Sequence, residues 1–240
     1  MINRLPEWAQ PVAEYMLHTG LRNTLIIAGT SVFLAVVLGV LLGTLLTIRF
    51  LPLQAAIRLY IEVWRGLPII VTIFILFFGL PTLADELNVE ALRLSEIKAA
   101  ILGLSLWGSA QIAEATRGAV QSIPREQHEA AAALGFRWVG THVFVILPQA
   151  LRRLLPPLVS LSVNIIQNST LAQILGVAEL LETAERSTER LSFPTVDPTT
   201  LSVEGGDPHA LQIYGAVMVI FFLISFPLTR LAAYLERRLV

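Results

Sequence analysis

Long runs without charged residues alternate with charged segments along this chain. Four runs lack Asp, Glu, Lys and Arg for long enough to cross a hydrocarbon core of about 30 Å. They are residues 23–48, 66–84, 154–178 and 208–229. A fifth run, 99–113, becomes long enough if its helix continues past Glu114. The pattern predicts an all-α integral membrane protein with five transmembrane helices, which we place at about residues 22–48, 59–82, 97–119, 153–178 and 209–232.

The basic residues between these spans indicate which side each segment faces. Cytoplasmic segments of membrane proteins carry an excess of Lys and Arg. With the N-terminus outside, eleven of the 17 basic residues fall on the inner side and six on the outer side. The outer segments 85–96 and 179–207 are rich in Asp and Glu. The charge pattern therefore predicts an N-out, C-in chain that crosses the membrane five times.

The composition agrees with a membrane location and excludes several kinds of site. Hydrophobic residues make up 55% of the 240 residues and charged residues 15%, whereas soluble proteins average about 25% charged residues. The mean hydropathy is +0.68. The chain has no cysteine, which excludes a disulfide framework and a thiolate metal site. Lys98 is the only lysine and belongs to no Gly-Lys-Ser/Thr sequence, so we expect no ATP and no other cofactor in this chain.

The chain also lacks the sequence patterns of common enzymes. Neither HExxH nor GxSxG occurs, and the four histidines have no metal-ligand spacing. They are His18, His128, His142 and His209. We therefore expect a non-enzymatic membrane protein with no metal site and no nucleic-acid partner.

Residues 129–148, EAAAALGFRWVGTHVFVILP, have the length of a sixth span. A crossing here would place Arg152 and Arg153 on the opposite side from Arg125 and would invert every later element. It would also put Arg137 in the hydrocarbon, at a cost of about 2.5–3.5 kcal/mol. The sequence therefore predicts an apolar loop on the inner face, at about residues 120–150.

The residues of this loop predict a helix-turn-helix. Glu126 and Glu129 suit the first turn of a helix, and Ala130–Ala133 are strong helix formers of small bulk. Gly135 fits a left-handed C-cap, after which we expect a second short helix through Trp138–Ile146 that stops before Pro148. The small residues fit a docking face for a partner protein. An amphipathic helix that lies in the lipid headgroups is the alternative.

The same loop resembles the signature loop of permease subunits in bacterial ATP-binding-cassette (ABC) importers. That pattern is Glu-Ala-Ala, three residues, Gly, nine residues and Ile-x-Leu-Pro, and Val145 replaces its isoleucine here. Three further segments resemble the polar amino acid uptake branch of this family: residues 60–68, 113–124 and 164–180. The residues that match the loop pattern are Glu129, Ala130, Ala131, Gly135, Leu147 and Pro148.

The resemblance implies a division of labour among subunits in a bacterial cytoplasmic (inner) membrane. Two permease chains form the pathway, and two cytoplasmic ATPase subunits bind ATP and Mg and drive it. An extracytoplasmic solute-binding protein delivers a polar amino acid. The predicted loop would be the coupling helix that seats in a groove of the ATPase, and the spans would be embedded in the lipid bilayer.

Polar side chains interrupt the fourth predicted span. Asn164, Gln167 and Asn168 share one helix face, and Thr170 follows them. Because amides at membrane depth are costly, this face is a candidate lining of the substrate pathway, with interhelical hydrogen bonding as the alternative. Many relatives carry Lys-Asp where this chain has Gln167-Asn168. This departure suggests a second, different permease chain that supplies the charged pair, with an identical copy as the alternative.

Other positions allow two interpretations each. Glu62 and Arg65 lie three residues apart and can form a structural ion pair or part of the pathway floor. The acidic helical pattern 179–190 precedes Pro194 and belongs to a solvated loop, or to a segment that contacts the solute-binding protein or gates the outer mouth. Gly39 and Gly43 permit close helix approach in the first span.

A second class of function also fits a small polytopic chain. A self-sufficient secondary transporter or channel for small zwitterionic solutes would work without an ATPase. Such a protein is expected to carry an acidic residue near the middle of a span, where it couples transport to protons or sodium ions. Only Glu62 and Glu114 approach that position. An opine or another small zwitterion is the nearest rival to an amino acid as solute.

Overall fold

The computed structural model describes residues 6–48, 50–196, 203–204 and 206–239. Part of the predicted outer segment 179–207, namely residues 197–202 and 205, lies outside the described residues. Within the described part all regular secondary structure is helical, except for one antiparallel pair of two-residue strands. These strands are β1 (Thr195–Val196) and β2 (Val203–Glu204). The all-helical fold expected from the hydropathy pattern is thus confirmed.

The first helix begins before the predicted span. α1 (Ala9–Tyr15) continues through a π-helical turn, Met16–Leu21, into α2 (Arg22–Leu45). Together they form an uninterrupted helix of 37 residues, long and apolar enough to cross a membrane. α2 packs along α6 (Glu96–Gln121), and Gly39 and Gly43 make this approach possible. A Cβ on Gly43 would lie 2.4 Å from the Ala113 carbonyl oxygen, so the close approach permitted by this glycine pair is confirmed.

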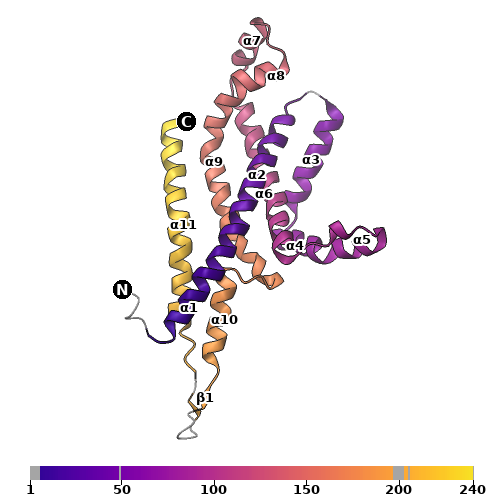
Figure 1. The fold of residues 1–240 in the computed structure, drawn as a ribbon. Coiled ribbons are helices and arrows are strands. Elements are labelled where there is room, and N and C mark those ends of the chain that lie inside the picture. The colour runs from indigo at the N-terminus through magenta and orange to yellow at the C-terminus, as the bar shows by residue number, and fades with distance from the viewer. Residues whose placement is uncertain (1–5, 49, 197–202, 205, 240) are drawn as a thin grey trace.

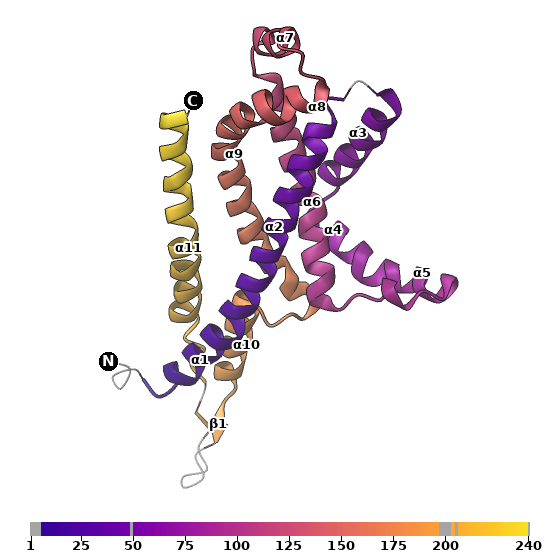
Figure 2. The same ribbon diagram turned by 45° about the horizontal axis from the view of Figure 1, so that its top comes forward.

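The second predicted span, 59–82, is wrong as a single helix. α3 (Leu51–Gly66) ends at Leu67, whose backbone is extended, and α4 (Ile69–Phe74) starts after Pro68. Proline clashes with a helical conformation of the residue before it and has no N–H to donate. A π-helical turn, Ile75–Gly79, connects α4 to α5 (Leu80–Leu87). In both views α5 projects sideways from the bundle (Figures 1 and 2).

The inner loop also differs from the prediction after its first helix. α7 (Arg125–Ala133) is followed by α8 (Trp138–Gly140), a π-helical turn (Thr141–Ile146) and α9 (Leu147–Asn168). Helical structure therefore continues through Pro148, and the expected stop before this proline is wrong. Pro148 is the second residue of α9 and follows directly after the π-helical turn, where the regular α-helical hydrogen-bond pattern is already interrupted. A 3₁₀ turn, Ser169–Leu175, completes a helical segment of 38 residues from Trp138.

The remaining helices are α10 and α11. α10 (Leu180–Ser192) confirms the helix expected over the acidic pattern, and α11 (Ala210–Leu239) covers the last predicted span and extends past it. α7 and α8 lie at one end of the molecule, and α1, α10 and β1 lie at the other (Figure 1). The core joins α2, α6 and α9 through fully buried side chains that include Ile27, Leu104, Ile112 and Ile165.

The outward faces of the long helices are apolar. Phe33 on α2 is 67% exposed and Met218 on α11 is 70% exposed. Four helical segments are long and apolar enough to span a membrane: Ala9–Leu45, Ile69–Leu87, Trp138–Leu175 and Ala210–Arg238. α6 carries Glu96, Lys98, Glu114 and Arg117 and is not among the four. The exposed apolar faces suit contact with lipid.

Candidate functional site

The predicted docking loop folds around a short helix at one end of the molecule. Pro124 caps α7, and Glu126 lies in its first turn, where a negative charge suits the helix dipole. Glu129 forms an ion pair with Arg125, with 3.0 Å between Glu129 Oε1 and Arg125 Nε. Both side chains are exposed, so the pair contributes little to stability.

Gly135 ends α7 in the conformation that the sequence predicts. Its φ of +83° lies in the left-handed region, which favours glycine. The Gly135 N–H donates to the Ala132 carbonyl at 2.9 Å, and the Phe136 N–H donates to the Ala131 carbonyl at 3.1 Å. These two bonds form a Schellman motif, which satisfies carbonyls at the helix end. The predicted left-handed C-cap is confirmed.

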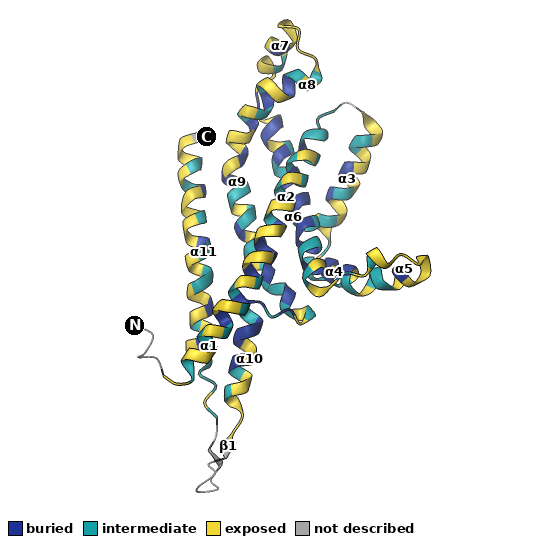
Figure 3. Ribbon diagram, viewed as in Figure 1, coloured by how far each residue is buried: buried dark blue, intermediate teal, exposed yellow. Residues whose placement is uncertain are grey.

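The exposed residues of α7 include three small ones, Ala130, Ala132 and Ala133, which this chain leaves uncovered. Ala131 is buried against the loop, whereas Ala130 is exposed and Leu134 is 79% exposed. Figure 3 shows α7 as exposed over most of its length. Leu147 is half-buried and Pro148 exposed at the start of α9, where the loop returns to the bundle. The arrangement leaves a partner free to approach the α7 backbone.

Hydrogen bonds tie the base of this loop to the ends of the long helices. The His142 ring Nε2 and the Thr47 hydroxyl lie 3.0 Å apart, and Nδ1 lies 2.9 Å from the Trp138 carbonyl oxygen. The Trp138 ring stacks on His142 with 4.0 Å between centroids. Arg153 donates to the Ser122 carbonyl at 2.6 Å. A displacement of the loop would therefore act on α2, α6 and α9 together.

The polar residues of the fourth predicted span lie on an open face of α9 and the following turn. Asn164 and Gln167 are exposed. Asn168 donates to the Asn164 carbonyl at 2.8 Å, and the Thr170 hydroxyl donates to the Gln167 carbonyl at 3.0 Å. In the described part of the chain, none of the four side chains bonds to another helix. Hydrogen bonding between helices of this chain is therefore not their role, and pathway lining stays a prediction.

Glu62 and Arg65 lie elsewhere, in a charged cleft between α3 and α6. The cleft has a volume of about 360 Å³. The expected ion pair between Glu62 and Arg65 is absent from the described structure. Instead Arg117 Nε donates to Glu114 Oε2 at 2.9 Å. Both Glu62 and Arg65 are exposed, and an exposed pair gains little over hydration. The cleft is also lined by Leu46, Arg58, Ile61, Glu114 and Arg117, and not by the amides of α9.

A buried carboxyl group at the opposite end of the bundle is a feature that the sequence reasoning did not single out as a site. Glu179 is fully buried and caps α10, accepting from the Glu182 N–H at 2.8 Å. The Thr24 hydroxyl donates to Glu179 at 3.4 Å and accepts from the Leu180 N–H at 3.0 Å. Burial raises the pKa of Glu179 to about 7.

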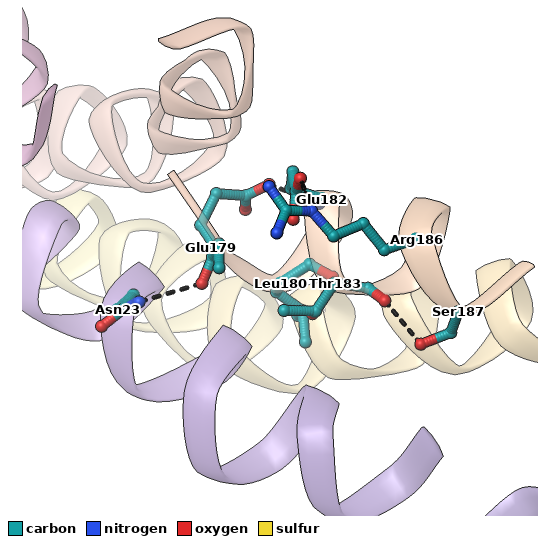
Figure 4. A network of polar contacts seen from close by, with 8 residues as sticks. Asn23, Glu179, Leu180, Glu182, Thr183, Arg186 and Ser187 are labelled. Atoms are coloured by element: carbon teal, nitrogen blue, oxygen red, sulfur yellow. Dashed lines mark hydrogen bonds and ion pairs between the residues drawn. The ribbon is translucent and has the colours of Figure 1, made fainter. Parts of the chain in front are cut away.

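A second bond reinforces this contact between α2 and α10. Asn23 on α2 donates to the Ala178 carbonyl at 2.9 Å, beside Glu179 (Figure 4). The network joins residues more than 150 positions apart in the sequence. The sequence signal for this network was Glu179 itself, an acidic residue between apolar neighbours at the N-cap position of a helix. The predicted outer segment therefore starts as a packed element, and its interpretation as a solvated loop is wrong for α10.

Comparison with known proteins places this architecture in a family. Residues 35–240 match the family described as the binding-protein-dependent transport system inner membrane component. The chain belongs to this family. It is accordingly an integral component of the inner membrane, within a transport system that includes a solute-binding protein.

Individual relatives agree with this assignment. The chain is 37% identical over 166 residues to the probable amino-acid ABC transporter permease protein YckA of Bacillus subtilis, covering 69% of this chain and 70% of the relative. It is 33% identical over 224 residues to the glutamine transport system permease protein GlnP of Escherichia coli K12, covering 93% of each.

Solved structures show the same fold at lower identity. An amino acid ABC transporter crystallised with histidines has a TM-score of 0.74 and 23% identity, over 98% of this chain and 99% of the other. The MetNI methionine ABC transporter in an inward-facing form has a TM-score of 0.72 and 17% identity, over 96% and 99%.

Proposed function

We propose that this chain is the permease subunit of a bacterial ABC importer and forms the translocation pathway for a polar amino acid. The observation that carries the proposal is the exposed, small-residue face of α7, which ends in a Schellman turn at Gly135. Such a face suits docking of a cytoplasmic ATPase, which binds the ATP and Mg that this chain does not. The names of the relatives in B. subtilis and E. coli support an amino acid as the solute.

In this proposal the chain is N-out and C-in. α2 and α6 run toward the end that carries α7, α9 runs away from it, and α11 returns (Figure 1). α3 to α5 form the remaining crossing, which the break at Pro68 interrupts. These are the five predicted crossings, at about 22–48, 59–82, 97–119, 153–178 and 209–232, with the coupling loop at about 120–150 inside and the segment 179–207 outside. The chain would act as a single transmembrane domain.

The open amide face supports a pathway shared between two permease chains. Asn164, Gln167, Asn168 and Thr170 are the candidate contacts, and a second chain would cover them. Because Gln167-Asn168 lacks the charges of many relatives, we propose a heteromeric pair that works with two ATPase copies. Purification of the complex decides this point, since a homodimer with full transport would contradict it.

Uptake into proteoliposomes tests the main proposal. The chain is reconstituted with its ATPase and solute-binding protein, and accumulation of labelled glutamine and histidine is measured with and without ATP. We expect uptake only when ATP and the binding protein are both present. Uptake by this chain alone, without ATP, would indicate a secondary transporter or channel, which the family membership does not favour.

A further inference from the structure

A cavity near the end of the bundle opposite α7 has a charged rim and apolar walls. It has a volume of about 460 Å³ and lies between α1 and α10. Tyr15 of α1 and Trp8, the residue before α1, are both half-buried, and α10 contributes Arg186 and Arg190. Trp and Tyr are enriched where membrane proteins meet the headgroup layer. The remaining walls are Pro11, Val12, Ser187 and Leu191.

The charge at this cavity matches one phosphodiester group. Arg186 and Arg190 lie one helical turn apart on α10 and face the same cavity. Arg186 is paired with the largely buried Glu182, whereas Arg190 forms no ion pair within the described structure. No acidic residue is among the described residues that line the cavity. Arg186, Glu182 and Arg190 together carry one net positive charge. Arginine donates readily to phosphate oxygens.

An apolar groove continues from this cavity. It has a volume of about 220 Å³, lies between the α1 segment and α11, and shares Trp8 and Val12 with the cavity. Gln212 is the only polar residue in its described lining. Leu17 in the groove lining is 48% exposed, and Leu211, which precedes Gln212 in the sequence, is 85% exposed, as expected of a surface in contact with lipid. The other lining residues are Ala9, Ala13, Met16, Ile213, Ala216 and Ile220.

We infer that this composite site binds one anionic phospholipid. Its phosphodiester lies between Arg186 and Arg190, beside the Tyr15 hydroxyl, and one acyl chain fills the groove below Trp8. The Trp8 ring is fixed for this role because it stacks on His209 with 4.0 Å between ring centroids. A zwitterionic lipid fits less well, since its ammonium group would approach the arginines. The inference requires only the membrane location and not the proposed transport function.

Such a lipid would stabilise the contact between three elements that are distant in sequence. It would bridge α1, α10 and α11, and α10 is also held to α2 through Glu179. A carboxylate on the solute-binding protein could also meet Arg190, but it would leave the apolar groove empty. We therefore argue for the lipid and treat the protein contact as an outcome of the test.

Lipid retention by the purified, full-length complex tests the site. The complex is exchanged into nanodiscs of phosphatidylcholine with a minor fraction of phosphatidylglycerol or phosphatidylethanolamine, and bound lipids are counted by native mass spectrometry. We expect retained phosphatidylglycerol, a loss of about tenfold in Arg190→Gln, and near-normal retention in Arg190→Lys. Arg22→Gln is the matched control, an exposed arginine at the same end that lines neither cavity.

Two further measurements separate the possible occupants. Ala216→Phe should fill the groove and reduce phosphatidylglycerol retention, while inorganic phosphate should fail to displace the lipid. Displacement by phosphate together with normal retention in Ala216→Phe would indicate a simple anion site and overturn the inference. Unchanged lipid retention in Arg190→Gln would also overturn it, and weaker capture of the solute-binding protein in that variant would then assign Arg190 to that partner.

Discussion

At the scale of single residues, Gly135 is the position where backbone conformation matters most. A Cβ there would meet nothing within 4 Å, so the cost of a substitution comes from its φ of +83° alone. A β-branched residue in the left-handed region costs at least about 1–2 kcal/mol. Because the turn positions the exposed face of α7, its loss would act on the docking of a partner and leave the spans intact.

We therefore expect Gly135→Val to insert into the membrane normally but to co-purify with less ATPase and to lose most uptake. Gly135→Asn is the control, since asparagine tolerates the left-handed region. Quantitative co-purification and proteoliposome uptake measure the two effects. Normal assembly and transport in Gly135→Val would show that the turn has no role in coupling.

The burial of Glu179 makes the stability of the folded protein depend on pH, and it also fixes the direction of that dependence. Its pKa rises from 4.5 to about 7 in the folded protein. The folded state therefore binds the proton more tightly, and the associated stability is fully present below pH 4.5 and lost as the pH rises through 7. The shift corresponds to about 3 kcal/mol at most.

In the purified complex we expect the unfolding temperature to fall between about pH 5 and pH 8. Glu179→Gln should flatten this slope and unfold at a higher temperature than the wild type at pH 8, because a neutral amide can replace the protonated carboxyl. Glu185→Gln, an exposed acid on the same helix, is the control. An unchanged slope in Glu179→Gln would assign the pH dependence to other groups.

At the scale of elements, the contact between α2 and α6 depends on the absence of side chains. A Cβ at Gly39 would lie 2.6 Å from Ile112 Cβ, and one at Gly43 would lie 2.4 Å from a backbone oxygen. Backbone atoms yield less than the ends of flexible side chains. The helix pair could accept a larger residue only by separating.

We expect Gly43→Val to destabilise the fold by about 1–3 kcal/mol, the cost of overpacking a tight contact. Gly29→Val on the same helix meets nothing within 4 Å and should change stability by less than about 0.5 kcal/mol. The unfolding midpoint in detergent compares the two variants. Equal midpoints would mean that α2 and α6 are not held at this distance.

At the scale of the whole molecule, the proposed coupling loop and the proposed pathway face lie apart from one another. α7 lies at one end of α9, and Asn164, Gln167 and Asn168 lie toward the other. The first should govern assembly with the ATPase and the second should govern passage of the solute. The two effects can therefore be separated by mutation.

We expect Gln167→Ala to reduce uptake about fivefold, the effect of losing one hydrogen-bonding group, without changing ATPase co-purification. Ser162→Ala is the control, because Ser162 lies on another face of α9 and donates to the Leu158 carbonyl of its own helix. If Gln167→Ala transports normally, this side chain does not line the pathway.

The sequence by itself determined the features that depend on local chemistry. The uncharged runs predicted the helices around 22–45, 96–121 and 210–239, since burial in lipid requires long apolar segments. Gly135 predicted its own turn because few other residues adopt a positive φ. The spacing around Glu129, Gly135 and Pro148 also indicated the family that residues 35–240 match.

The tertiary structure alone decided what depends on neighbours that are remote in sequence. The break at Leu67 and Pro68 turns α4 and α5 aside, and the helix through Pro148 avoids the expected stop. The amides of α9 lie apart from the charged cleft that contains Glu62, although both were candidates for one pathway. Glu179 is acidic and would be expected in water, yet it is buried where the start of α10 meets the Met16–Leu21 turn and Thr24 of α2. Hydropathy reports whether a segment can leave water, but the contacts between segments determine which side chains do so.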